Sequence, residues 1–198
     1  MQPLTLIFVG PQGSGKGTQI TKLKDVLATK FPTTKLVSVQ TGDLFRALLA
    51  KGETFAEKKV AESLSRGELQ PDFLTNVLWG REMLTQLDDQ SNLLIDGFPR
   101  TVVQANVLQE AFTFFARTKI QIINLDTPEA IVKERMRGRG RADDTPESIE
   151  KRLQGYREDT LPVLDFYQKQ SDAMVHNIDG SQSIEEVHQA ILAVLELS

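Results

Sequence analysis

The sequence holds 198 residues, of which 40% are hydrophobic and 25% charged, and this composition is that of an ordinary globular protein with one full core. A net charge of −4 and a pI near 5.3 argue against general nucleic-acid binding, which is typical of domains with a basic face and a high pI. The chain has no cysteine, which excludes disulfides, cysteine-bound zinc and thiol catalysis.

The apolar runs of the chain predict no membrane span. None of them approaches the ~18 apolar residues that a spanning helix needs. The first ten residues, MQPLTLIFVG, lack the basic start and the cleavage site of a secretory signal and are typical of a strand. We therefore expect a cytoplasmic monomer that binds neither a membrane nor nucleic acid.

Short apolar runs alternate with longer amphipathic segments along the chain. Five runs predict strands, at residues 4–9, 35–39, 92–96, 119–126 and 172–179. Their nearly continuous apolar character is typical of strands buried on both faces of a parallel sheet. The alternation indicates an α/β fold with a doubly wound, five-stranded parallel sheet and helices on both faces.

Helix start signals lie between the predicted strands. The first helix is predicted from about Gly17. A later one is predicted with Thr127 as its N-cap and Pro128 as its first helical residue, and the same signal recurs at Thr145, before Pro146. A last helix is predicted over about 183–197, where apolar residues recur on one face.

Two regions interrupt the alternation. Residues 41–90 contain helical patterns and no strand, and the segment RMRGRGR, 135–141, has an arginine at every second position. We interpret residues 1–198 as one domain with three parts. These are a core (1–40, 91–135 and 146–198), a helical excursion (41–90) and a short arginine-rich segment (136–145).

A phosphate-binding loop directly follows the first predicted strand. The segment GPQGSGKGTQ, 10–19, fits the pattern G-x-x-x-x-G-K with Gly10, Gly15 and Lys16. Glycines let backbone N–H groups curl around phosphate oxygens, the next helix adds donors, and the lysine can reach the β- and γ-phosphates. The strict pattern continues with Ser or Thr, whereas here Gly17 intervenes and Thr18 supplies the hydroxyl. We therefore predict a site for a nucleoside triphosphate.

Asp96 ends the third predicted strand, where a carboxylate that orients water on Mg²⁺ belongs in such a protein. A simple cap of the following turn is the alternative reading of this residue. Thr18 is a second candidate contact of the ion. We predict Mg²⁺ bound together with the nucleoside triphosphate, and no zinc.

A second group of residues suits an acceptor that itself carries a phosphate. TGDLFR (41–46) and DGFPRT (96–101) leave the carboxyl ends of two strands, where ligands bind in open α/β sheets. Arg46 and Arg100 offer planar forks that bind two phosphate oxygens at once, and Thr41 offers a hydroxyl. One helical turn beyond Arg100, the amide of Gln104 can read a base edge with one donor and one acceptor.

Four motifs stand in order along the chain: GPQGSGKGTQ, TGDLFR, DGFPRTVVQA and RGRADDTPESIEKRL. Together they resemble the nucleoside monophosphate kinases, most closely the adenylate kinase family, over essentially the whole chain. The resemblance implies a P-loop kinase fold with a helical region that binds the monophosphate. It also implies the reversible, Mg-dependent transfer of the ATP γ-phosphoryl group to AMP, which yields two ADP and serves adenine nucleotide homeostasis.

The resemblance further implies roles for single residues. The implied ATP contacts are Gly13, Ser14, Gly15, Lys16, Gly17, Thr18, Arg135, Arg139, Gly180 and Gln182. The implied AMP contacts are Thr41, Arg46, Glu68, Leu69, Gln70, Gly97, Arg100, Gln104, Arg141 and Arg152. The implied catalytic residues are Lys16, Arg100, Arg135, Arg139, Arg141 and Arg152.

The arginine-rich segment corresponds to a minimal lid in this comparison. Long-form relatives insert a small sheet here, in some cases with cysteine-bound zinc, and this chain has no room for the sheet and no cysteine. Gly138 and Gly140 let the segment swing while its arginines close over phosphates and exclude water. Asp143 and Asp144 either orient lid arginines or cap the next helix, and the sequence leaves both interpretations open.

The nearest alternative is a UMP/CMP or broad-specificity nucleoside monophosphate kinase. Such enzymes usually carry Asn and Ala where this chain has Gln104 and Thr41, so AMP is the favoured acceptor. Gln70 departs from the Val that the family commonly places against adenine, which bears on base selectivity. A nucleotide sensor without turnover and an RNA-binding regulator are alternatives of other classes. The complete set of site residues argues against the first, and the acidic pI against the second.

Overall fold

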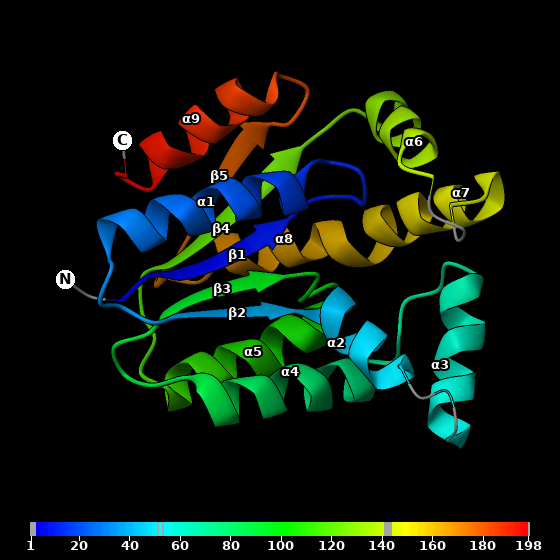
Figure 1. Cartoon of the computed structure of the whole chain (residues 1–198), viewed down its shortest axis with the longest axis horizontal. Helices are drawn as coiled ribbons and strands as arrows, with labels where there is room; N and C mark the ends of the chain where they lie inside the picture. The colour runs from blue at the N-terminus through cyan, green and yellow to red at the C-terminus, as the bar shows by residue number, and fades with distance from the viewer. Residues whose placement is uncertain (1–2, 51, 53, 141–143, 198) are drawn as a thin grey trace.

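The computed structural model describes residues 3–50, 52, 54–140 and 144–197. Its strands are β1 (Thr5–Val9), β2 (Leu36–Gln40), β3 (Asn92–Asp96), β4 (Ile120–Asp126) and β5 (Ala173–Asp179). Its helices are α1 (Lys16–Lys30), α2 (Thr41–Leu49), α3 (Phe55–Ser65), α4 (Asp72–Gln86), α5 (Val102–Phe114), α6 (Glu129–Gly138), α7 (Pro146–Gly155), η1 (Tyr156–Thr160), α8 (Leu161–Gln168) and α9 (Ile184–Val194). Figure 1 shows them arranged around one sheet.

The five strands form a parallel sheet in the order β2-β3-β1-β4-β5, which confirms the predicted doubly wound fold. Side chains of β1 alternate between two cores. Ile7 and Val9 pack into the core with α4, α5 and α8, whereas Leu6 and Phe8 pack into the core with α1 and α9. Helices therefore cover both faces, and the carboxyl ends of β1, β2 and β3 open toward the same edge of the sheet (Figure 1).

The predicted helical excursion consists of α2, α3 and α4. Helix α3 starts with a capping box, in which the Thr54 hydroxyl accepts from the Glu57 N–H and the Glu57 carboxylate accepts from the Thr54 N–H. Helix α4 packs against β2, and Trp79 stacks on Phe98 at 5.3 Å between ring centroids. The excursion is thereby attached to the core beside the loop that follows β3.

The predicted start of α6 is wrong by one position. Pro128, and not Thr127, is the N-cap, because Pro128 keeps an extended ψ of 136° and its carbonyl accepts the Val132 N–H at 3.1 Å. The Thr127 hydroxyl is buried instead against Gly180, where a Cβ would lie 2.0 Å away. The start of α7 follows the prediction, since the Thr145 hydroxyl accepts the Ser148 N–H at 3.2 Å.

A π-helical turn, η1, joins α7 to α8 and has no counterpart in the sequence prediction. The extra residue that such a turn accommodates carries Thr160 toward the loop after β3, where its hydroxyl donates to the Arg100 carbonyl at 3.1 Å. Within the part of the chain that the structure describes, no helix is long and apolar enough to cross a membrane.

Candidate active site

The loop between β1 and α1 is a cradle built on glycine. Gly13 and Gly15 have φ values of 90° and 103°, which side chains rarely adopt. A Cβ at Gly13 would also lie 2.9 Å from the Val132 carbonyl oxygen. The first helical bond of α1 runs from the Gln19 N–H to the Gly15 carbonyl, so the N–H groups before it have no helical partner. The loop therefore presents donors for an anion, with Gly17 and Thr18 exposed on the first helical turn.

Lys16 folds back over this loop. Its Nζ donates to the carbonyls of Gly10 (2.6 Å) and Pro11 (2.9 Å). Burial lowers the pKa of its ammonium group to about 8, and the nearby carboxylate of Asp96 acts in the opposite direction. A bound phosphate would raise this pKa again, so the site is set up for an anionic ligand.

Arg135 connects the P-loop to the turn between β5 and α9. Its Nη1 donates to the carbonyls of Ser14 (3.2 Å) and Gly180 (3.0 Å). Gln182 lies exposed on the same turn and donates to Asp179 at 2.7 Å. The predicted ATP contacts of the P-loop, Arg135 and Gly180 are thus brought together, and a contact of the Gln182 backbone carbonyl with the ATP base stays a prediction.

Asp144 gathers two of the predicted lid-side arginines. Its carboxylate, 2% exposed, accepts from Arg139 Nε (2.6 Å) and Nη2 (2.9 Å) and from Arg152 Nη1 (2.6 Å). These bonds hold the pKa of Asp144 below its usual range. Of the two interpretations, arginine orientation fits, because Thr145 caps the helix. Arg141 lies outside the described residues, as does Asp143, and the role of Arg141 stays a prediction.

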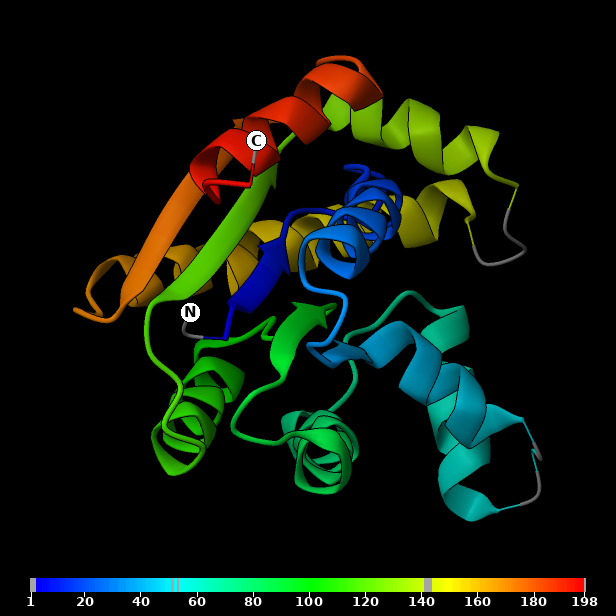
Figure 2. The same cartoon turned by 60° about the vertical axis from the view of Figure 1, so that its left-hand side comes forward.

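The predicted AMP contacts lie together. A cavity of about 580 Å³ is lined by all of them that the structure describes: Thr41, Arg46, Glu68, Leu69, Gln70, Gly97, Arg100, Gln104 and Arg152. We call it the acceptor pocket. Its walls come from α2, the α3–α4 loop, the loop after β3, and α7. Figure 2 shows α2 and α3 on one side of this end of the molecule and α6 and α7 on the other.

Gln104 has a fixed orientation in the acceptor pocket. It is buried, its Oε1 accepts the Arg100 N–H at 2.9 Å, and its Nε2 donates to Asp72 Oδ1 at 2.8 Å. An N–H can only donate and a carboxylate can only accept, so the two ends of the amide cannot be exchanged. One amide N–H and one oxygen lone pair remain for a ligand. Asp72 was not among the predicted site residues.

Gly97 brings the loop after β3 close to α2. Its φ is +83°, and a Cβ there would lie 2.4 Å from the Thr41 hydroxyl oxygen. The Gly97 carbonyl accepts from Arg100 Nε at 2.8 Å, which fixes the guanidinium. Burial lowers the pKa of Arg100, and the carboxylate of Asp96 opposes that effect. Arg100 is thus a desolvated cation held for an anionic partner.

Charged pairs occupy the rim of the acceptor pocket. Arg46 is exposed and pairs with Asp43. Glu68 accepts from Arg66 Nε and from Lys151 Nζ, each at 2.9 Å, and these bonds lower its pKa to about 2. Because Lys151 belongs to α7, this pair joins the α3–α4 loop to the opposite wall.

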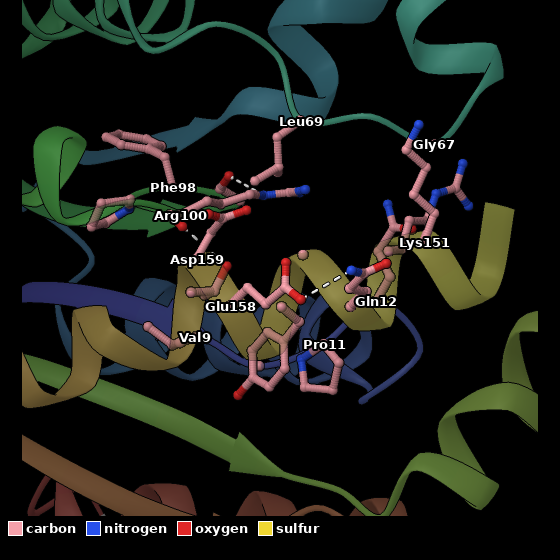
Figure 3. Close-up of a pocket in the computed structure, with 18 of the residues that line it drawn as sticks. Val9, Pro11, Gln12, Gly67, Leu69, Phe98, Arg100, Lys151, Glu158 and Asp159 are labelled. Atoms are coloured by element: carbon pink, nitrogen blue, oxygen red, sulfur yellow. Dashed lines mark hydrogen bonds between the residues drawn. The ribbon is translucent and has the colours of Figure 1, made fainter.

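A second cavity, of about 300 Å³, adjoins the acceptor pocket and is drawn in Figure 3. Lys16 is among the residues that line it. Arg100 and Arg152 line both cavities. In Figure 3, Arg100 and Glu158 project from opposite walls of the second cavity. Because Arg100 and Arg152 line both cavities, they stand where a phosphate on the Lys16 side and a phosphate on the acceptor side would meet.

Asp96 has an unused oxygen at the end of β3. Its Oδ1 is buried without a hydrogen-bond partner among the described residues, which fits a carboxylate that holds a hydrated cation. Within the same part of the chain, no group of three or more His, Asp or Glu could hold a metal ion by itself. A metal at this site would depend on ligand phosphates for most of its contacts.

Comparison with known proteins identifies the family to which this chain belongs. The family model described as adenylate kinase matches residues 8–172. The chain belongs to the adenylate kinase family. The adenylate kinase of Corynebacterium urealyticum is 38% identical over 194 residues, which cover 98% of this chain and 99% of that protein. Those of Xanthomonas euvesicatoria (38% over 197 residues; 97% and 99% covered) and Stenotrophomonas maltophilia (36% over 198 residues; 98% and 100% covered) are similarly close.

Adenylate kinases use ATP and AMP and are generally Mg-dependent, and membership makes this chain a phosphotransferase of the nucleoside monophosphate kinase type. The matched residues include the P-loop lysine and the acceptor pocket. The names of the relatives do not favour the UMP/CMP alternative.

What the sequence did not show is the support of this site by Asp72. An acid in the first turn of a helix is usually explained by the helix dipole, and this common explanation hides its bond to Gln104.

Proposed function

We propose that this chain is an adenylate kinase that transfers the γ-phosphoryl group of Mg·ATP to AMP and yields two ADP. The observation that carries the proposal is the pair Arg100 and Arg152, which lines both the cavity at Lys16 and the acceptor pocket. A donor and an acceptor phosphate would meet at these guanidinium groups. Adjacent binding of two nucleotides is what direct in-line transfer requires.

The residues perform this reaction by position and charge. The P-loop N–H groups and Lys16 would hold the donor phosphates, with Arg135 and Arg139 beside them. Arg46, Arg100 and Arg152 would hold the acceptor phosphate, and Thr41 and Gln104 its base. No protein base is required, because phosphoryl transfer depends mostly on alignment and on stabilisation of charge at the equatorial oxygens.

Mg²⁺ would be held at the edge of β3. The unpartnered Oδ1 of Asp96 suits a water-mediated contact, and the Thr18 hydroxyl is a second candidate. Bound with ATP, the ion supplies neutralisation of the β- and γ-phosphate charge. The charge of Asp96 acts against the effect of burial on the pKa values of Lys16 and Arg100, which places this carboxylate near both cations of the site.

We further propose the functional division into a core (1–40, 91–135, 146–198), an AMP-binding region (41–90) and a lid (136–145). Helix α6 runs on to Gly138, so the first three lid residues are helical. The bonds of Asp144 to Arg139 and Arg152 support a lid in which guanidinium groups are prepositioned. We also propose a monomer, which sedimentation equilibrium at micromolar concentration would test.

The proposed function is tested by measuring phosphoryl transfer to several nucleoside monophosphates in parallel assays. Purified protein is given Mg·ATP with AMP, CMP or UMP, and diphosphate products are separated by anion exchange. We expect ADP formation with AMP at a kcat/KM at least about 100-fold above the values for CMP and UMP, since mismatched polar groups in a buried base pocket cost several hydrogen bonds. Preference for a pyrimidine would contradict the assignment of Gln104 and Thr41.

An Arg100→Ala variant tests the acceptor side separately. Loss of a buried guanidinium that binds phosphate should raise the KM for AMP by about 10- to 100-fold and the KM for ATP much less. Equal effects on both nucleotides would remove Arg100 from the acceptor side. Arg66→Ala, at the exposed rim, is the matched control and should leave both constants within about twofold.

A further inference from the structure

The acceptor pocket contains a second carboxamide, that of Gln70. The residue is 8% exposed, lines the same cavity as Gln104, and stands two positions before Asp72, to which Gln104 is bonded. Both amides therefore line the acceptor pocket, one bonded to the first residue of α4 and the other just before it in the chain. A buried carboxamide offers two donors and an acceptor, so its hydrogen bonds matter to whatever base enters the pocket.

Gln70 differs from Gln104 in how it is held. Its one partner among the described residues is the Ser63 hydroxyl, which lies 3.1 Å from Gln70 Oε1 and 3.0 Å from Nε2. A hydroxyl can donate or accept, so it can support the amide in either orientation. When Ser63 donates to a carbonyl of α3, at Val60 or Lys59, it still accepts from Gln70. In both arrangements an N–H and a lone pair of Gln70 remain for a ligand.

The neighbouring wall imposes no fixed polarity either. Leu64 is apolar, and Thr75 is buried and lines the cavity with a hydroxyl that can donate or accept. Glu68, the one acid among the described residues that line the pocket, is already bonded to Arg66 and Lys151. The Gln70 side of the pocket can therefore adapt to its ligand, whereas the Gln104 side cannot.

The chemistry of purines makes this difference testable. Adenine presents N6–H as a donor beside N1 as an acceptor. A 6-oxopurine presents O6 as an acceptor beside N1–H as a donor, so the same edge has reversed polarity. A carboxamide that can rotate by half a turn, so that its oxygen and its NH₂ group exchange places, matches both edges with two hydrogen bonds. A carboxamide of fixed orientation matches only one of the two edges.

We propose that Gln70 is a specificity-determining residue that lets 6-oxopurine nucleoside monophosphates serve as acceptors beside AMP. The proposal rests on the acceptor-pocket assignment of the proposed function and extends it to a substrate class. AMP remains the best acceptor, because Gln104 keeps its orientation through Arg100 and Asp72. Removing the Gln70 amide should therefore lower transfer to 6-oxopurine acceptors more than transfer to AMP.

The test compares AMP, IMP and GMP as acceptors for wild type and for Gln70→Met, which keeps the length of the side chain and removes its amide. We expect wild type to form IDP and GDP. In Gln70→Met the ratio of kcat/KM for AMP to that for IMP should rise about tenfold, as expected for the loss of one buried hydrogen bond. Gln189→Met, at an exposed position of α9, should leave all values unchanged.

Each contrary result has a separate meaning. Wild-type transfer to AMP without transfer to IMP or GMP would overturn the inference and leave the proposed function standing. An equal loss for all acceptors in Gln70→Met, or no change in the ratio, would assign Gln70 a structural role and also overturn the inference. No transfer from ATP to AMP by folded wild type would contradict the proposed function itself.

Discussion

The donor and acceptor sides of the site differ in how their ligand contacts are held. On the donor side, Lys16 and Arg135 donate to main-chain carbonyls, among them those of Gly10 and Gly180. On the acceptor side, a side chain takes part as well, because the amide of Gln104 accepts from the Arg100 N–H and donates to the carboxylate of Asp72. The donor side therefore depends on the path of the backbone, and the acceptor side depends more on the identity of neighbouring residues.

This contrast has a functional meaning. A triphosphate is the same on every nucleotide, so a cradle of main-chain groups suffices for it. The acceptor side must distinguish bases, and side-chain contacts can be changed by a single substitution. Mutations of supporting residues should accordingly alter acceptor use in graded ways, while loss of the P-loop cation should stop turnover.

The largest expected effect belongs to Lys16→Ala. Removal of the cation at the donor phosphates should lower kcat by about 10²- to 10³-fold, the range seen when one charge-stabilising donor is lost. Initial rates of ADP formation measure it, and circular dichroism with thermal melting shows whether the protein is folded. Near-normal turnover by folded Lys16→Ala would contradict the donor-side assignment.

A smaller effect is expected for Asp144→Asn, which keeps the shape of the side chain and removes its charge. Arg139 and Arg152 would lose charge-assisted hydrogen bonds, so kcat should fall about 10- to 100-fold. The control is Glu147→Gln, an exposed acid in the first turn of α7, three positions after Asp144. Similar kinetics for the two variants would show that Asp144 does not orient the arginines.

The pH dependence of ATP binding should test the donor-side assignment of Lys16 further. The pKa of Lys16 is lowered to about 8, so its ammonium form is lost as the pH rises through that value. We expect the Kd for ATP, measured by calorimetry, to rise about tenfold between pH 7 and pH 9, one unit beyond the pKa. Lys16→Ala should show a nearly flat profile. A rising profile in that variant would assign the titration to another group.

The smallest effect is expected at the rim. Glu68→Gln removes the ion pair between the α3–α4 loop and Lys151 of α7, and we expect the KM for AMP to rise about twofold at low salt and to converge with wild type at high salt. Glu62→Gln is the control, because Glu62 pairs with Lys59 inside α3 and joins no separate elements. A salt-independent difference would exclude an electrostatic cause.

Much of the fold could be predicted because the strands carry a continuous apolar signal that ends at polar or glycine-rich loops. The start of α6 could not, since the Thr127–Pro128 pair gives the same cap signal as Thr145–Pro146, and only burial against Gly180 separates the two. Likewise η1 leaves no mark in the sequence, because a single extra residue does not change hydrophobic periodicity enough to be recognised.

The candidate site could be predicted where a motif ties a residue type to a strand end, as for Lys16, Thr41 and Arg100. The supporting residues could not be predicted in the same way. Asp72 and Ser63 belong to no motif, because an acid in the first turn of a helix is common and Ser63 is one of several polar residues of α3, so nothing in the sequence marks their bonds to Gln104 and Gln70. Which side chain supports which ligand contact depends on tertiary packing that no local pattern records.

The π-helical turn η1 lies within a continuous helical segment from Pro146 to Gln168 and sets how α7 is rotated about the helix axis relative to α8. Helix α8 packs in the core, and α7 carries Arg152, which lines the site. A helix advances by about 100° per residue, so deleting one residue within η1 would turn the two halves against each other by roughly that angle. Arg152 would then point away from the two cavities that it lines together with Arg100, without any change in its own sequence neighbourhood. The alignment of the two nucleotides in this protein therefore depends on the number of residues in η1.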